Sequence, residues 1–83
     1  MPYITEEART ELEDPNRRPM TPGELNYIIT CVVTEYLGPR GEHSYTRINE
    51  VIGVLECAKL ELYRRIAAPF EDIKIKENGD VYP

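Results

Sequence analysis

Four side chains that can bind an anion fall close together near the middle of the chain, namely Arg40, His43, Tyr45 and Arg47. A helix is predicted to begin at Tyr45, and the backbone N–H groups and dipole at a helix N-terminus favour negative charge. The cluster therefore predicts a site for a small anion or a nucleotide. An ordinary solvated connector explains the same residues equally well, so both interpretations stay open.

Carboxylates on two predicted helices suggest a second kind of chemistry, because oxygen ligands from facing helices can bind Mg²⁺ or Mn²⁺. The residues concerned are Glu24, Glu50 and Glu56. All-helical nucleotide pyrophosphohydrolases use acidic pairs one helical turn apart, and Glu50 and Glu56 do not have that spacing. The pattern favours a solvated or salt-bridged face, and a divalent-metal-dependent nucleotide hydrolase is the alternative.

Two asparagines, Asn26 and Asn49, lie at the edges of predicted apolar helix faces. A polar side chain buried there needs a hydrogen-bond partner, and Glu56 is a candidate partner for Asn26. The favoured interpretation is that these groups specify the register between helices. The alternative is that they contact a ligand at a seam between subunits.

The two cysteines, Cys31 and Cys57, lie within apolar helical stretches and are interpreted as small core residues. Two thiols and one histidine are too few for a structural zinc site. A Cys–His nucleophile would need His43 beside an activated thiol, which an apolar helix interior does not provide. The sequence therefore predicts no catalytic residue and no cofactor.

The clearest helix start places Thr21 as N-cap, Pro22 at the first helical position and Glu24 where it closes a capping box. This helix is predicted to run to about Leu37, before the stop at Gly38. Its apolar residues recur with the period of a helix and form one stripe. They are Leu25, Ile28, Ile29, Val32, Val33 and Tyr36.

A second and longer helix is predicted from Tyr45 to Ala68, where Pro69 ends it. Its main stripe consists of Ile48, Val51, Ile52, Leu55, Ala58, Leu62 and Ile66. Val54 and Leu60 widen the apolar surface beyond that stripe. Because the shorter helix cannot cover the longer one, the surplus predicts a homo-oligomer, a dimer or larger, built as a helical bundle.

Two short segments flank this hairpin. Residues 1–20 form an N-terminal arm with a short helix capped by Thr5. In the tail, residues 69–83, isoleucine and lysine alternate before the turn residues Asn78-Gly79. The predicted fold is thus mainly α: an antiparallel two-helix hairpin over 21–68, a short N-terminal helix, and a small C-terminal β-hairpin or extended tail.

The length and net charge of the chain exclude some classes of function, among them DNA coating. The chain has 83 residues, which predicts one domain, and its net charge is −5 at pH 7. Such a surface repels nucleic-acid phosphates, so no DNA coating is expected. No apolar run approaches the ~20 residues of a membrane span, and the polar opening does not read as a secretory signal. The sequence therefore predicts a cytoplasmic protein without a membrane role.

Three segments carry a family likeness: GELNY at 23–27, INEVIGVLECAKLELYRR at 48–65 and ENGDVY at 77–82. They resemble a family of small uncharacterised phage, prophage and bacterial proteins. The likeness covers most of the chain, from Gly23 to Tyr82, and the opening Pro2-Tyr3-Ile4. It implies a cytoplasmic location, which is the host cytoplasm for a phage-encoded protein. It implies no activity and carries no catalytic residue over.

The predicted function is that of a non-enzymatic, phage- or prophage-like binding protein that is homo-oligomeric. Its expected ligand is a small anion or nucleotide that it sequesters, or a host protein that it blocks. Besides the hydrolase, a purely structural oligomerisation module is the further alternative. Small phage proteins often act by binding ligands where their subunits meet. The prediction rests on the analogy between this chain and such proteins in size and genomic setting.

Overall fold

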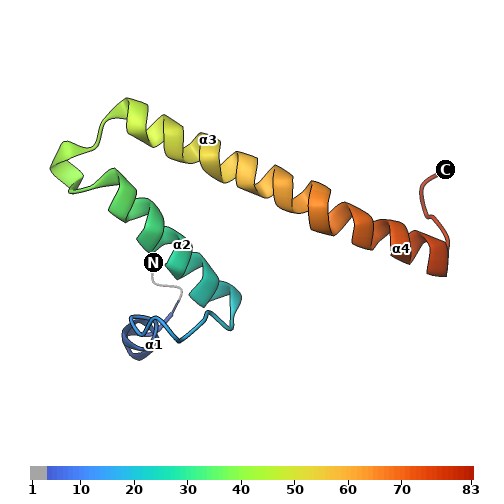
Figure 1. Ribbon diagram of the computed structural model, residues 1–83, viewed down its shortest axis with the longest axis horizontal. Coiled ribbons are helices and arrows are strands. Elements are labelled where there is room, and N and C mark those ends of the chain that lie inside the picture. The colour runs from blue at the N-terminus through green and yellow to red at the C-terminus, as the bar shows by residue number, and fades with distance from the viewer. Residues whose placement is uncertain (1–3) are drawn as a thin grey trace. The chain divides into compact units, whose positions relative to one another are not determined.

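The computed structural model describes residues 4–83, and the mainly α prediction is confirmed (Figure 1). The chain divides into two compact units, one that ends at Ser44 and one that spans Tyr45–Pro83. Over the described residues the first unit contains the helices α1 and α2 with a short 3₁₀ turn, and the second is one continuous helix followed by a tail. The single domain and the packing of the predicted hairpin stay predictions, because both concern the relation between the units.

Helix α1 spans Glu6–Glu11 and begins as predicted at Thr5. The Ala8 N–H donates to Thr5 Oγ1 at 3.1 Å, which satisfies one backbone donor of the first turn. Just after the helix, Leu12 is only 7% exposed, and α1 contacts α2 in the same chain. The arm is therefore docked on its own unit through a buried leucine.

Helix α2 spans Pro22–Leu37, with the bounds that the sequence predicted. The Glu24 N–H donates to Thr21 Oγ1 at 3.1 Å, so the predicted N-cap is confirmed. At the other end, Gly38 has φ of 80° and its N–H donates to the Thr34 carbonyl at 3.0 Å. A side chain is strained at that φ, and glycine is therefore the residue that ends this helix.

A short 3₁₀ turn, η1, spans Arg40–Glu42 and follows α2. The ring N–H at His43 Nε2 donates to the Gly38 carbonyl, with the two atoms 2.8 Å apart. This bond joins the two ends of the connector. It therefore gives His43 a local structural role within the first unit.

The second unit is a continuous run of helix in three parts: α3 at Tyr45–Leu62, the π-helical turn η2 at Tyr63–Ala67 and α4 at Ala68–Asn78. The prediction that Pro69 ends the long helix is wrong. A proline clashes with the carbonyl four residues earlier and lacks an N–H. The wider i→i+5 turn of η2 comes directly before it, so the chain passes the proline without leaving the helix.

The predicted C-terminal β-hairpin or extended tail is also wrong, since residues 68–78 are helical. Two contacts of Lys74 support the helix: its Nζ lies 5.5 Å from the Phe70 ring centroid and 3.5 Å from Glu77 Oε2. Both partners are one turn away, and such pairs stabilise helices. Gly79, with φ of 84°, donates its N–H to the Ile75 carbonyl at 2.8 Å, so it ends α4 instead of turning a hairpin.

Buried side chains are few among the described residues, and both examples, Leu12 and Glu24, belong to the first unit. The interpretation of Cys31 and Cys57 as core residues is wrong, because both are exposed. Among the helices over residues 4–83, none is long and apolar enough to cross a membrane.

Candidate functional site

The main candidate site is a line of side chains that runs along α3 and into the π-turn η2, called here the α3 seam. It comprises Tyr45, Ile48, Ile52, Leu55, Lys59, Leu62 and Ile66. Their separations alternate between three and four residues, which is the a/d repeat of a coiled coil. The seam is thus a pattern made for packing against another helix.

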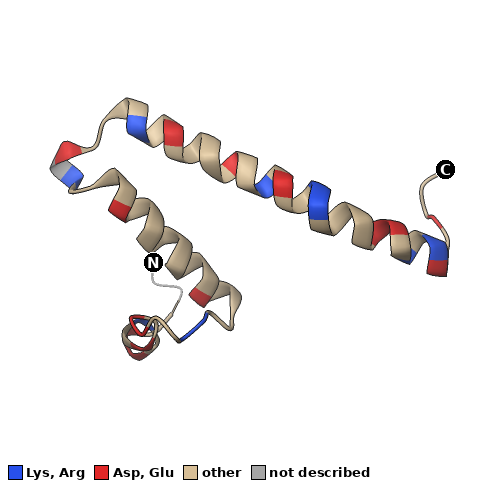
Figure 2. Ribbon diagram, viewed as in Figure 1, with Lys and Arg blue, Asp and Glu red and all other residues tan. Residues whose placement is uncertain are grey.

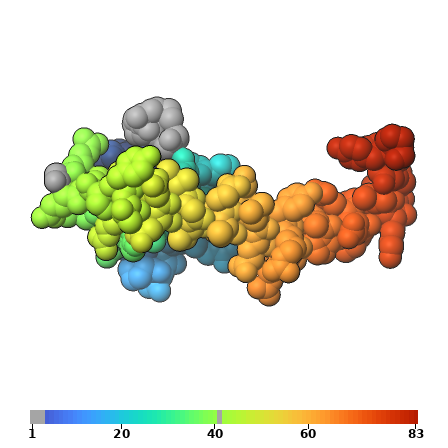
Figure 3. All heavy atoms as spheres, turned by 90° about the horizontal axis from the view of Figure 1, so that it is seen from above, coloured from blue at the N-terminus to red at the C-terminus, as the bar shows by residue number. Residues whose placement is uncertain are grey.

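The apolar members of the α3 seam face solvent in the single chain. Ile52 is 61% exposed, Leu62 58% and Ile66 63%. No residue of α3, η2 or α4 is buried, and all of these residues lie in the described part of the chain. Figure 3 shows one face of this rod, with yellow α3 running into orange α4. An exposed apolar stripe of this length is a candidate interaction surface.

Charged residues of both signs are interspersed along the same rod (Figure 2). Within it, Arg65 Nη1 lies 3.9 Å from Glu61 Oε2, one turn away. Exposed pairs of this kind contribute only a few tenths of a kcal/mol each. The charges therefore act mainly as a polar border to the apolar seam.

Lys59 is the one charged member of the α3 seam. Its Nζ lies 3.0 Å from Oε1 of Glu56, on the preceding turn. The carboxylate is thus available to neutralise the ammonium group beside the seam. A lysine at such a position is compatible with a paired helix, and it restricts which pairings are favourable.

The π-turn η2 limits how far the seam extends. An i→i+5 turn holds about one residue more than an α-turn, so it rotates the residues that follow relative to α3. Phe70 and Ile73 in α4 are exposed at 58% and 57%, but they follow η2 and do not continue the line of α3. The regular α-helical repeat therefore ends at Leu62, and Ile66 lies within η2.

The predicted anion site is divided between the two units. Arg40 and His43 close the first unit, and Tyr45 and Arg47 begin the second. The side chains of all four are exposed. His43 is engaged with the Gly38 carbonyl, so its ring orientation is set by the connector itself.

The predicted polar residues Asn26, Asn49 and Glu56 are exposed in the single chain. Asn26 lies on α2, where its carbonyl accepts from Thr30 Oγ1 at 2.9 Å. Asn49 and Glu56 lie on α3, and Glu56 pairs with Lys59. A bond between Asn26 and Glu56 would join different units and stays a prediction.

Glu24, from the alternative metal set, is held by other groups. Its two carboxylate oxygens each accept from Arg17 Nη2 at 3.1 Å, and Oε1 also accepts from the Met20 N–H at 2.8 Å. The residue is only 8% exposed. The predicted capping box thus forms with Met20 in place of Thr21 as the backbone donor.

The other two members of that set, Glu50 and Glu56, belong to the second unit. Across the described residues, no three histidine, cysteine, aspartate or glutamate side chains gather where they could hold a metal ion. Glu24 is committed to an ion pair with Arg17, in which one guanidinium nitrogen, Nη2, donates to both carboxylate oxygens. The geometry at Glu24 therefore favours a structural role for this carboxylate.

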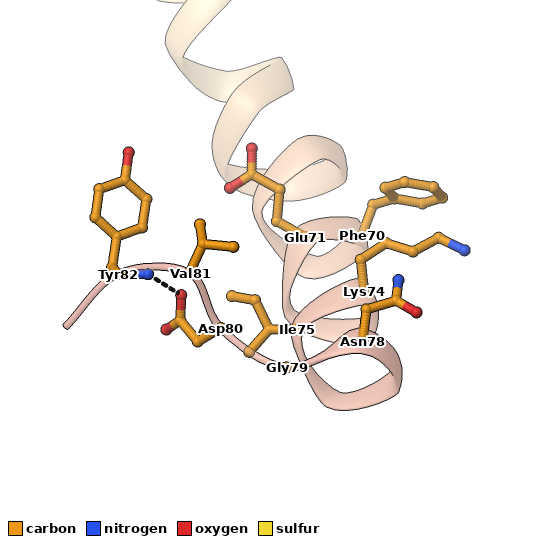
Figure 4. Close-up of a pocket in the computed structure, with 9 residues that line it drawn as sticks. All are labelled: Phe70, Glu71, Lys74, Ile75, Asn78, Gly79, Asp80, Val81 and Tyr82. Carbon is orange, nitrogen blue, oxygen red and sulfur yellow. Dashed lines mark hydrogen bonds between the residues drawn. The ribbon is translucent and has the colours of Figure 1, made fainter.

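The C-terminal end of α4 carries a shallow hollow (Figure 4). Phe70, Lys74 and Asn78 form one row along the helix, while Val81 and Tyr82 lie on the other side, near Ile75. Beyond Gly79, the Tyr82 N–H donates to Asp80 Oδ1 at 2.9 Å and turns the chain end. This open, mixed surface offers no convergent polar groups that would define a ligand site.

Tyr63 lies in η2 and donates its hydroxyl to Glu71 Oε2 at 3.2 Å, across the π-turn. The negative charge of Glu71, and then this hydrogen bond, raise the pKa of Tyr63 above its ordinary value of 10.0. The bond forms across the turn that precedes Pro69. It therefore links η2 to α4.

We expect the Tyr63 contribution to stability to disappear at alkaline pH. Because folding raises the pKa, the protonated phenol stabilises the helix below about pH 10, and this is lost as the pH rises through the folded pKa. The unfolding temperatures of the protein and Tyr63→Phe should differ at pH 8, and the difference should shrink as the pH rises above 10. The control is Tyr82→Phe, which removes a phenol from a residue that is 82% exposed and lies outside the α3 seam. An undiminished difference at pH 11 would contradict the link.

Two residues of these sites were missed by sequence reasoning. Lys59 had a readable signal, since it occupies one position of the alternating three-and-four spacing that runs through the apolar residues of α3. Arg17 had none, because it lies in the loop between α1 and α2 and its pairing with Glu24 depends on the path of that loop.

Comparison with known proteins agrees with the family likeness at a coarse level. Neither the curated proteins nor the solved structures contain a match to this chain. One family does match, over residues 1–81, and its description is "Domain of unknown function (DUF6899)". Because the match covers nearly the whole sequence, the chain belongs to the family described as domain of unknown function DUF6899.

Proposed function

We propose that this chain is a small, non-enzymatic binding protein that works as a homo-oligomer, with α3 as its assembly helix. The observation that carries the proposal is the α3 seam, whose apolar side chains are spaced for helix pairing and exposed in the single chain. Contiguous exposed apolar surface with a polar border is characteristic of interaction sites. A chain this short also gains stability from a partner more than a larger domain does.

The proposed setting is a phage or prophage, as the sequence likeness implies, and the proposed location is the host cytoplasm. The proposed ligand is a small anion or nucleotide near Arg40, His43, Tyr45 and Arg47. Two arginines and a helix that starts at Tyr45 support this choice. The metal-dependent hydrolase lacks comparable support, because Glu24 is occupied by Arg17 and Met20.

Sedimentation equilibrium at micromolar concentration tests the assembly, and a dimer or larger species is expected. A folded monomer would contradict the proposal. It would favour the alternative in which α2 of the same chain packs on the α3 seam. Because only the native state binds, a ligand raises the unfolding temperature by mass action. A thermal-shift panel of cyclic and linear nucleotides, Mg²⁺ and Mn²⁺ therefore tests the ligand.

The panel also separates the alternatives. A shift with a nucleotide but no turnover supports binding. Metal-dependent turnover that is lost in Glu56→Gln would establish the hydrolase instead. If the protein is an oligomer and none of these compounds raises its unfolding temperature, two functions remain: a purely structural oligomerisation module, or a protein that binds a host protein.

A further inference from the structure

The order of residue types along the α3 seam distinguishes its alternate positions. In the coiled-coil repeat, the positions that precede a three-residue step are called a, and the others d. The a positions are Tyr45, Ile52, Lys59 and Ile66, and the d positions are Ile48, Leu55 and Leu62. Two of the four a positions, Ile52 and Ile66, are thus β-branched, and two of the three d positions are leucine.

From this order we infer that the α3 helices of two copies pair in parallel and in register, as a two-stranded coiled coil. The inference rests on the proposed assembly and specifies its geometry. Isoleucine at a with leucine at d favours two strands in a parallel coiled coil. In a parallel pair each seam residue faces the same residue of the other chain, so isoleucine meets isoleucine and leucine meets leucine. Antiparallel pairing would set a positions against d positions and would lose this match.

Lys59 supports a pair over a larger bundle. In the parallel pair the two Lys59 side chains share one layer, and each ammonium group has Glu56 of its own chain 3.0 Å away. A larger bundle would enclose three or more ammonium groups around a central axis, where burying charge is costly. A single lysine at an a position is a known way to specify register and strand number, at some cost in stability.

The surface available is large enough for a stable pair. The α3 seam with the flanking Tyr63 presents on the order of 800 Å² per chain, about what each partner contributes to a standard interface. From Tyr45 to Ile66 the repeat covers three heptads, about the shortest length that indicates a coiled coil. Because η2 spans Tyr63–Ala67, the last heptad runs into the π-turn, and the pair is expected to part there, before α4.

The occupant of the seam is therefore a second copy of this chain. The nearest competitor is α2 of the same chain, which also carries an apolar stripe with Leu25 and Val32 exposed at 50% and 63%. If α2 covered α3 within one chain, no covalent link between α3 helices would form. The geometry can thus be tested by crosslinking.

The test uses single cysteines in a chain that carries Cys31→Ser and Cys57→Ser. Ile52→Cys lies at an a position and faces its own copy in a parallel pair, within the reach of a disulfide. Under mild oxidation with oxidised glutathione we expect most of this variant to become a covalent dimer. Val54→Cys is the matched control, since Val54 is 66% exposed and lies off the seam.

Antiparallel pairing gives a different result. It would bring opposite ends of the seam together, so a mixture of Ile48→Cys and Ile66→Cys chains would form mixed dimers while Ile52→Cys would not crosslink. That outcome overturns the parallel geometry but leaves the oligomer intact. Equal crosslinking of Val54→Cys would overturn it too. A monomer in sedimentation equilibrium overturns the inference and the proposed assembly together.

Discussion

Replacing Leu55 by lysine is expected to weaken self-association by at least about 100-fold. Leu55 lies at the centre of the α3 seam, and burying one leucine side chain contributes about 1.5–3 kcal/mol. Leu55→Lys removes that contribution from both chains and sets a new charge one turn from Lys59. Because tenfold in Kd corresponds to about 1.4 kcal/mol, two lost leucines exceed two factors of ten. Sedimentation equilibrium over a concentration series measures the change.

Two variants give this experiment its controls. Val54→Lys adds the same charge at the neighbouring position, off the seam, and introduces a better helix former, so it should leave the association nearly unchanged. Lys59→Leu should act in the opposite direction and tighten the association, because it replaces the charged layer with an apolar one. If Leu55→Lys and Val54→Lys weaken association equally, the α3 seam is not the interface.

Removing the Glu24 carboxylate is expected to destabilise the first unit by about 2–4 kcal/mol. Glu24 accepts two hydrogen bonds from Arg17 and one from the Met20 N–H while it is almost fully buried. Glu24→Ala leaves the arginine and the amide without this partner. Amide hydrogen exchange resolved along the chain should show faster exchange in α1 and the first turn of α2.

The matched control is Glu35→Ala, which removes an exposed carboxylate from the same helix and should leave exchange unchanged. Arg17→Ala should accelerate exchange in the same segments. The double variant should be no worse than the more damaging single one, because the two residues act through one interaction. Independent, additive effects of the two changes would contradict the pairing seen in the structure.

Local signals account for the parts of the fold that were predicted correctly. Thr5 and Thr21 each offer a hydroxyl to a backbone N–H three residues ahead, and Gly38 adopts a φ that few other residues tolerate. These interactions involve residues within one turn, so they can be read from sequence. The start of α1 and both bounds of α2 were predictable for that reason.

The tail was mispredicted because two local signals conflicted. Alternating Ile73 and Ile75, followed by Asn78-Gly79, is typical of a hairpin, whereas Lys74 makes helical pairs with Phe70 and Glu77. A strand needs a second strand to satisfy its backbone, and a helix satisfies its own. With the rod of α3 and η2 already in place, α4 continues it and needs no other partner.

The features of the candidate site also fall into two groups: those that the sequence determined and those that only the tertiary structure decided. The sequence alone determined the helix starts and the apolar periodicity of α3, including the alternate spacing that contains Lys59, because these depend on neighbours along the chain. Only the tertiary structure decided that Glu24 is enclosed by Arg17 and that Cys31 and Cys57 face solvent. Burial depends on which segments meet in space, and no local pattern encodes that.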